Sequence, residues 1–162
     1  MHEELLDLAR TVGAEAAALL MDRPPAFEIE EKSTAIDIVT QMDKKAETFI
    51  VQSILAVRPD DGMIGEEGAE IESKSGITWV IDPLDGTAQY ATGGDEFAVH
   101  IALWQANSEL AGKITAASVS VPARKELWSM DEPVQRYQPR GNPIRILVSR
   151  SRPPKELAAI VA

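Results

Sequence analysis

Cysteine is absent from the 162-residue chain, which excludes disulfide bonds, thiolate nucleophiles and zinc sites that depend on cysteine. No apolar run approaches the ~20 residues that a membrane-spanning helix needs, and there is no internal repeat or low-complexity tract. The first residues, Met1-His2-Glu3-Glu4, lack the basic-then-apolar order of a secretory signal. These absences favour a cytoplasmic protein with no membrane partner.

Positive charge is scarce over most of the chain. Residues 1–123 hold 22 acidic and 8 basic side chains, whereas residues 124–162 hold 4 acidic and 8 basic ones. Because nucleic-acid binding depends on contacts between cations and phosphates, a body this acidic argues against a nucleic-acid partner. A small phosphorylated partner is compatible with it only where metal ions offset the repulsion. The basic C-terminal segment is sparse and is interpreted as solvated surface.

What the sequence does contain is a short apolar run that leads directly into an acidic turn. Residues 79–81 (Trp-Val-Ile) have the composition of a strand covered on both faces. Pro83 lacks a backbone donor and is expected to end the strand, and Gly86 supplies a turn. Asp82 and Asp85 are then left at the mouth of a core element, where an uncompensated charge is costly to desolvate. Mg²⁺ suits a site made only of oxygen ligands.

Three other interpretations of this turn differ in how well the spacing fits them. A purely structural turn, in which Thr87 caps a following helix, is as compatible with the pattern as a metal site. An EF-hand loop would need an acidic or amide side chain at position 84, which is leucine, so that class fails. Phosphatases with a nucleophilic aspartate carry two aspartates separated by a single residue. The wider separation here disfavours a covalent aspartyl-phosphate.

A second motif, Gly65-Glu66-Glu67-Gly68, precedes the turn, and together they read G-E-E-G followed by W-V-I-D-P-L-D-G-T. Over nearly the whole chain, this composite resembles the inositol monophosphatase family of Mg²⁺-dependent, lithium-sensitive phosphomonoesterases. That family also includes bisphosphate nucleotidases, fructose bisphosphatases and a histidinol-phosphate phosphatase. The resemblance implies the first part of an αβαβα layered sandwich, and it suggests a homodimer.

The resemblance also implies roles for individual residues of the two motifs. One carboxylate of the G-E-E-G turn, that of Glu66, would bind metal and help to position the attacking water. The implied Mg²⁺ ligands are Glu66, Asp82, the carbonyl oxygen of Leu84, and Asp85. The backbone amides of Gly86 and Thr87 would hold the phosphate of the substrate.

Two residues outside these motifs also match the family. Lys32 looks like a lysine that the family carries on a loop near the metals, where it would contact substrate; an exposed loop lysine is an equally good interpretation. Thr40 and Asp43 have the spacing of a capping box at a helix N-terminus. In the family the aspartate at the position of Asp43 bonds the motif threonine, here Thr87, so both residues would take part in catalysis. His100 is interpreted as a packed or surface residue rather than a ligand.

Periodicity predicts an α+β fold in which two helices pack on a largely antiparallel sheet. The helices are expected at 3–21 and 41–57, and the inward face of the second at Ala46, Phe49, Ile50, Ser53, Ile54 and Val57. Strands are expected at 77–81, 98–104, 114–121, 126–130 and 144–149, the last four as an antiparallel meander. Residues 1–141 would form a metal-binding subdomain, and residues 142–162 the start of an incomplete C-terminal α/β subdomain.

These features predict Mg²⁺-dependent hydrolysis of a small, inositol-phosphate-like monoester by metal-activated water. Histidinol phosphate and 3′(2′),5′-bisphosphate nucleotides are the alternative substrates. The chain is expected to be only the first part of such a phosphatase, because the late W-D-x-A-A-G motif of the family, with a further metal-binding aspartate, is missing. A non-catalytic metal-binding or interaction module that needs a separate C-terminal half is therefore the alternative function.

Overall fold

A computed structural model describes residues 2–26, 29–31, 38–106, 112–132, 148–149 and 154–156. Most of them belong to one compact unit, Met1–Glu132, and Pro133–Ala162 form a second. The described residues of the second unit lie in neither helix nor strand. Lys32, the predicted boundary at residues 141–142 and most of the strand predicted at 144–149 lie outside the described residues.

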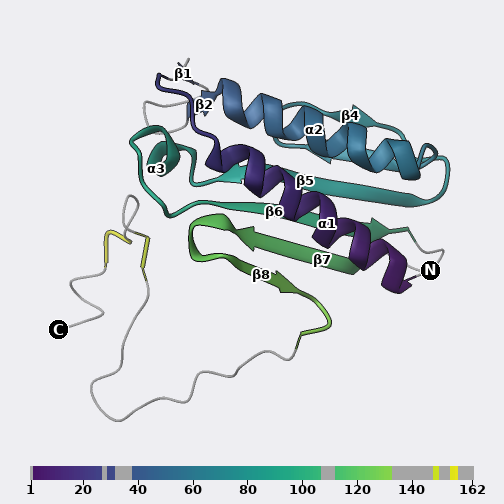
Figure 1. Ribbon diagram of the computed structural model, residues 1–162. Coiled ribbons are helices and arrows are strands. Elements are labelled where there is room, and N and C mark those ends of the chain that lie inside the picture. Colours follow the sequence, from purple (N-terminus) through teal and green to yellow (C-terminus); the bar gives the residue numbers. More distant parts are fainter. Residues whose placement is uncertain are drawn as a thin grey trace, which may run out of the picture. The chain divides into compact units, whose positions relative to one another are not determined.

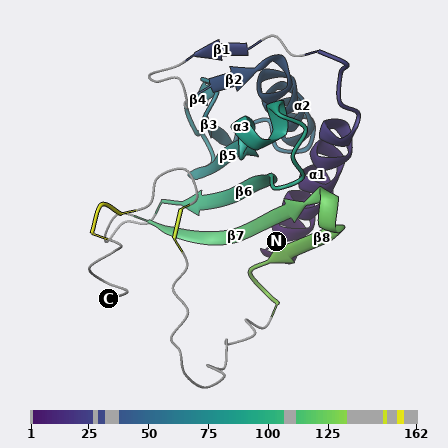
Figure 2. The same cartoon turned by 90° about the vertical axis from the view of Figure 1, so that its left-hand side faces the viewer.

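The first unit is built around a six-stranded mixed sheet with the order β4-β3-β5-β6-β7-β8 (Figures 1 and 2). In this sheet β3 and β5 run parallel and the other neighbours run antiparallel, which confirms a largely antiparallel sheet. The strands are β3 (Gly62–Gly65), β4 (Glu70–Ile71), β5 (Ile77–Asp85), β6 (Ala98–Gln105), β7 (Lys113–Val121) and β8 (Glu126–Ser129). A separate antiparallel pair, β1 (Ile29–Glu31) and β2 (Ile38–Thr40), precedes the second helix.

Two helices cover one face of this sheet, as Figure 2 shows from the side. Helix α1 (His2–Met21) packs on β6 and β7, and helix α2 (Gln41–Val57) packs on β5 and on α1. A short helix, α3 (Thr87–Ala91), follows β5, and a 3₁₀ turn, η1 (Pro122–Arg124), joins β7 to β8. None of the helices in the described part of the chain is long and apolar enough to span a membrane.

The core lies between these two helices and the sheet. Apolar side chains at helical spacing on α1 and α2 meet the inward side chains of β5 and β6, as predicted. The buried set includes Leu6, Ala9, Leu20, Ala46, Ile50, Ile54, Trp79, Ile81, Ile101 and Leu103. The predicted inward face of α2 was wrong at Val57, which is 63% exposed at the end of the helix. It also omitted two acidic residues of α2, Asp43 and Glu47, which are buried.

Strand β5 differs from its prediction in two ways. Its side chains are buried on the helix-covered face only, and Val80 on the opposite face is 39% exposed. Pro83 does not end the strand, because pairing with β6 resumes at Asp85 after a shift of register between Asp82 and Asp85. Irregularities of this kind are where a sheet accepts proline, since the missing N–H is not needed for the ladder there. The strand therefore carries both aspartates of the acidic turn.

A buried ionic network fixes the end of the sheet where β3 begins. Asp61 is 1% exposed and accepts hydrogen bonds from Arg58 (Nε to Oδ2, 2.9 Å), from the hydroxyl of Ser75 (2.6 Å) and from Nε1 of Trp79 (2.9 Å). Burial opposes ionisation of this carboxyl, but the hydrogen bonds from Arg58, Ser75 and Trp79 outweigh it and lower the pKa of Asp61.

We expect Asp61→Asn to lower the free energy of unfolding by about 2–4 kcal/mol at pH 7. The change removes a paired buried charge and places an amide N–H₂ group where Arg58, Ser75 and Trp79 need an acceptor. Asp60→Asn, at an exposed neighbouring position, is the matched control and should change little. The difference between the variants should begin to shrink near pH 4 and decrease further as pH falls, since a carboxyl with a lowered pKa loses its contribution only as the folded state becomes protonated. Urea unfolding at both pH values measures this; equal stability of the two variants at pH 7 would contradict it.

Candidate metal centre

The acidic turn at the end of β5 is held by its own backbone. The amide of Leu84 donates to Oδ1 of Asp82 at 3.2 Å, an Asx-type contact that fixes the aspartate relative to the turn. The side chain of Leu84 is buried (1% exposed). Asp82 is half-buried and Asp85 is exposed. The turn therefore presents one half-buried carboxylate, that of Asp82, and one exposed carboxylate, that of Asp85.

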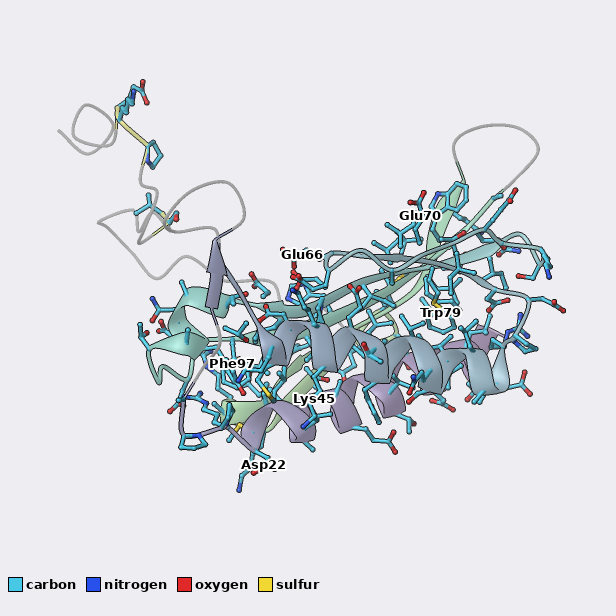
Figure 3. All side chains as sticks on the ribbon, turned by 90° about the horizontal axis from the view of Figure 1, so that it is seen from above. Asp22, Lys45, Glu66, Glu70, Trp79 and Phe97 are labelled. Carbon is cyan, nitrogen blue, oxygen red and sulfur yellow. The ribbon has the colours of Figure 1, made fainter. Side chains whose placement is uncertain are left out.

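The G-E-E-G turn brings a second carboxylate to Asp82. The amide of Glu66 donates to the carbonyl oxygen of Ile81 at 3.1 Å, which ties the turn to the residue just before Asp82. Burial, the negative charge and hydrogen bond of Glu66 and the charge of Asp85 together raise the pKa of Asp82 to about 7. Figure 3 shows Glu66 beside the first turns of α2. That Glu66, Asp82 and Asp85 share one metal site, as the resemblance implies, stays a prediction.

Asp85 lies on the open side of the cluster, beside His100 of the neighbouring strand. Its Oδ2 is 3.7 Å from Nε2 of His100, and the two side chains are 62% and 44% exposed. His100 is directly opposite Asp82 in the β5–β6 register. The histidine thus borders the acidic turn, a position that its place in the sequence did not reveal.

Asp43 takes both of the positions expected for it. Its Oδ2 accepts hydrogen bonds from the backbone N (2.8 Å) and the hydroxyl (2.7 Å) of Thr40, which caps helix α2. Its Oδ1 accepts from the hydroxyl of Thr87 at 2.8 Å. The Thr87 hydroxyl is also 3.0 Å from the carbonyl oxygen of Leu84. One buried carboxylate therefore links the start of α2 to the acidic turn.

Gly86 joins β5 to α3 in a conformation that other residues rarely adopt, with φ 90° and ψ 28°. A Cβ added there would lie 2.6 Å from the carbonyl oxygen of Glu96. Glycine is therefore required both by the backbone conformation and by the close approach of the following loop. The two constraints fix where Thr87 and its amide begin helix α3.

Gly86→Ala is expected to destabilise the chain by more than the ~1–2 kcal/mol that a left-handed backbone costs an L-residue. Gly93→Ala is the matched control, since Gly93 has a similar φ of 82° but open space around its Cβ position. Thermal unfolding of both variants separates backbone strain from the collision with Glu96. Equal destabilisation would show that the close approach has no energetic consequence.

Whether these residues fit a divalent metal ion depends on their donor chemistry. Burial, followed by the charge and hydrogen bond of Glu66, raises the pKa of Asp82, and a cation between the two carboxylates would offset the part of this shift that comes from Glu66. Their oxygens, with the carbonyl of Leu84, are hard ligands of the kind Mg²⁺ prefers. In the described part of the chain, however, no three histidine, cysteine or acidic side chains are gathered closely enough to hold a metal as they stand. The donors fit Mg²⁺ in kind, and Asp85 would have to turn toward the other two carboxylates.

The residues matched to the family's motifs thus lie together, apart from Lys32, which is outside the described residues. The sequence profile of the inositol monophosphatase family matches residues 1–151. The chain belongs to this family. Its α+β fold, with two helices on a mostly antiparallel sheet, agrees with that of solved members. An IMPase of Thermotoga maritima superposes with a TM-score of 0.69 at 29% identity, covering 91% of this chain and 54% of that one.

Curated relatives within the inositol monophosphatase family carry several activities in their names. A 3′-phosphoadenosine 5′-phosphate phosphatase of Mycobacterium bovis is 40% identical over 124 residues, which cover 73% of this chain and 46% of the relative. A histidinol-phosphatase of Chlorobaculum parvum is 33% identical over 142 residues, covering 87% of this chain and 52% of the relative. The chain spans about half the length of these relatives.

One acidic residue of this region, Glu47, was missed by the sequence analysis. It lies four residues after Asp43 on α2, is 5% exposed, and accepts hydrogen bonds from backbone amides of the G-E-E-G turn. Its spacing from Asp43 could have indicated its place, because residues four apart share one face of a helix and Asp43 was already expected to face the site. A glutamate beside Ala46 and Ile50 on a core-facing helix is unusual enough to need a partner.

Proposed function

We propose that the chain carries the metal-binding half of a Mg²⁺-dependent phosphatase that hydrolyses a small phosphate monoester. The observation that supports this most strongly is that the Glu66 amide donates to Ile81 at 3.1 Å, which brings the Glu66 turn to the half-buried Asp82 at the end of a strand whose turn also offers the Leu84 carbonyl. Membership of the inositol monophosphatase family supports the same reaction class.

In this proposal Glu66, Asp82, Asp85 and the Leu84 carbonyl would hold Mg²⁺. When bound, Mg²⁺ supplies Lewis-acid chemistry: it neutralises charge on phosphate oxygens and makes water a better nucleophile. The hydroxyl of Thr87 donates to Asp43, so its oxygen lone pairs are available to accept a hydrogen bond from the attacking water. Asp43 thereby sets the direction of the Thr87 hydroxyl and is placed to accept its proton.

The phosphate of the substrate would lie against the start of α3. Gly86 and Thr87 begin that helix immediately after the acidic turn, and their amides would donate to phosphate oxygens. An inositol-phosphate-like monoester is the substrate we favour, with histidinol phosphate and a 3′(2′),5′-bisphosphate nucleotide as alternatives that the names of the relatives support. Lys32 would contribute a positive charge on the substrate side, and cytoplasm is the proposed compartment.

A second candidate function is a metal-binding or interaction module that does not turn over substrate by itself. It is favoured by the coverage of about half of each relative and by the absence of a closed three-carboxylate cluster among the described residues. Such a module would need a separate half to complete the site.

The test is Mg²⁺-dependent release of phosphate from inositol 1-phosphate, histidinol phosphate and 3′-phosphoadenosine 5′-phosphate, with wild type and Asp82→Asn side by side. We expect phosphate release that needs Mg²⁺ and falls at least 100-fold in Asp82→Asn, as for loss of a group that acts on the transition state. Release that persists in Asp82→Asn would contradict it. A folded, inactive wild type that still binds Mg²⁺ would select the second candidate.

A further inference from the structure

The acidic site is made of two turns that are distant in sequence, and helix α2 contacts both. One turn carries Glu66, between β3 and β4; the other carries Asp82 and Asp85, at the end of β5. The amide of Glu66 donates to the carbonyl oxygen of Ile81, the residue before Asp82, at 3.1 Å. The position of the first turn therefore decides how far Glu66 lies from Asp82.

Glu47 is buried against the first turn and satisfies two of its backbone donors. Its Oε2 accepts from the amide of Glu67 at 2.8 Å, and its Oε1 accepts from the amide of Ala69 at 2.9 Å. The side chain is 5% exposed. A carboxylate buried in this way is costly unless hydrogen-bonded, and two amides of a single turn supply those bonds.

Gly65 makes room for this contact. A Cβ at that position would collide with the carboxylate carbon and Oε2 of Glu47. Gly65 also closes the turn, since its amide donates to the carbonyl of Ala69 at 2.7 Å. The backbone of the G-E-E-G turn thus lies directly on the carboxylate of Glu47, with the Glu66 amide tied to Ile81 on its other side.

Asp43 holds the second turn from the same helix face. It lies four residues before Glu47 and accepts from the hydroxyl of Thr87. Residues four apart on a helix are about 5–6 Å apart at Cβ. Asp43 and Glu47, two buried carboxylates one helical turn apart, therefore hydrogen-bond to the two turns of the site. Helix α2 would then set the spacing of the metal ligands.

We propose that Glu47 is a positioning residue that fixes the turn carrying Glu66, so that α2, through Asp43 and Glu47, determines the distance between Glu66 and Asp82. The inference rests on the proposed metal site. If Glu47 no longer holds the amides of Glu67 and Ala69, the turn that carries Glu66 can shift relative to Asp82, and metal binding must then also fix its position. Changes in residues that orient metal ligands typically weaken metal affinity 10–100-fold.

The test compares Glu47→Gln and Glu47→Asp with wild type, using the full chain. Glutamine keeps the size but can accept at only one of the two atoms; aspartate keeps the charge but is one methylene too short to reach both amides. Glu70→Gln is the control, because it makes the same change of charge at an exposed position on β4. Two quantities are measured: hydrogen exchange of the Glu67 and Ala69 amides in EDTA, and Mn²⁺ affinity by electron paramagnetic resonance, each where unfolding curves show the variant to be folded.

We expect faster exchange at those two amides and 10–100-fold weaker Mn²⁺ binding in both Glu47 variants, with Glu70→Gln unchanged. Equal weakening in both variants identifies simultaneous acceptance from the two amides, rather than charge alone or reach alone, as the cause. Wild-type Mn²⁺ affinity in a folded Glu47→Gln chain would overturn the positioning role and leave the proposed function intact. A wild-type chain that binds no Mn²⁺ would overturn the proposed metal site itself. Should Glu47→Gln fail to fold, the aspartate variant decides by the same two measurements.

Discussion

Replacing Asp82 by asparagine should stabilise the metal-free chain above pH 7 while removing the stabilisation that Mg²⁺ gives to wild type. The carboxyl of Asp82 has a pKa of about 7 in the folded chain, against an ordinary value of 3.8. The folded state therefore binds more protons than the unfolded state between about pH 4 and pH 7. The stability of the metal-free wild type must fall as pH rises through that window, whereas an asparagine at this position does not titrate.

The expected gain from Asp82→Asn at pH 8 is about 1 kcal/mol, because solvent screens this half-buried group and reduces the full effect of the shift. That corresponds to about 2–4 °C in Tm for a chain of this size. At pH 5, where the wild-type carboxyl is largely protonated, the two proteins should be nearly equally stable. Asp60→Asn is the control for a change of charge at an exposed aspartate.

Adding Mg²⁺ should reverse the order at pH 8. A ligand that binds only the folded state stabilises it in proportion to the logarithm of its concentration over Kd, and asparagine removes an anionic ligand. Thermal unfolding in EDTA and in millimolar Mg²⁺ at both pH values measures all these quantities. If Asp82→Asn is less stable than wild type at pH 8 in EDTA, the charge of Asp82 does not oppose folding. If it gains as much stability as wild type from Mg²⁺, Asp82 is not a ligand of the cation.

Asp43→Asn should produce the second large effect, a loss of both stability and phosphate release. Asparagine keeps one carbonyl oxygen and replaces the other acceptor by an amide, so it cannot accept from both Thr40 and Thr87. Hydrogen bonds to a charged group contribute about 1.5–3 kcal/mol, and general acid–base groups typically contribute 10²–10⁴-fold to rate. We expect losses in these ranges in the free energy of unfolding and in kcat.

Variants of the two partners of Asp43 separate its structural role from its catalytic one. Thr40→Ala removes the cap hydroxyl and should lower stability by about 1 kcal/mol with little change in kcat. Thr87→Val removes the hydroxyl that faces the acidic turn and should lower kcat much more than stability, whereas Thr87→Ser should retain activity. If Thr87→Val and Thr40→Ala change kcat equally, Asp43 serves only as a helix cap.

The local parts of this site were predictable from the sequence, because they depend on neighbours along the chain. The capping box of Thr40 and Asp43 is set by spacing within one helix, and the turn after Ile81 is set by the proline, glycine and aspartates that follow it. The two long helices also formed within a residue of their predicted bounds. In each case, periodicity or capping chemistry within a short window is sufficient.

The parts that were missed depend on partners distant in sequence. Glu47 contacts amides 20 and 22 residues away, and its role becomes visible only when α2 lies against the G-E-E-G turn. Pro83 was expected to end β5 because local rules cannot show the register shift that accommodates it. His100 was placed correctly in a strand, but its approach to Asp85 follows from the pairing of β5 with β6. Tertiary pairing, rather than local propensity, decides each of these.

The most direct test of the metal site is a calorimetric titration of the chain with Mg²⁺ at pH 7.5, beside Asp82→Asn. The structure predicts saturable binding by wild type in the millimolar range or tighter, accompanied by release of protons because Asp82 is partly protonated at that pH. The released protons are detected as heats that depend on the ionisation enthalpy of the buffer. The Asp82→Asn variant should show neither the binding nor the proton release. A folded wild type with no saturable Mg²⁺ binding, or one that binds Mg²⁺ as Asp82→Asn does, would contradict the account.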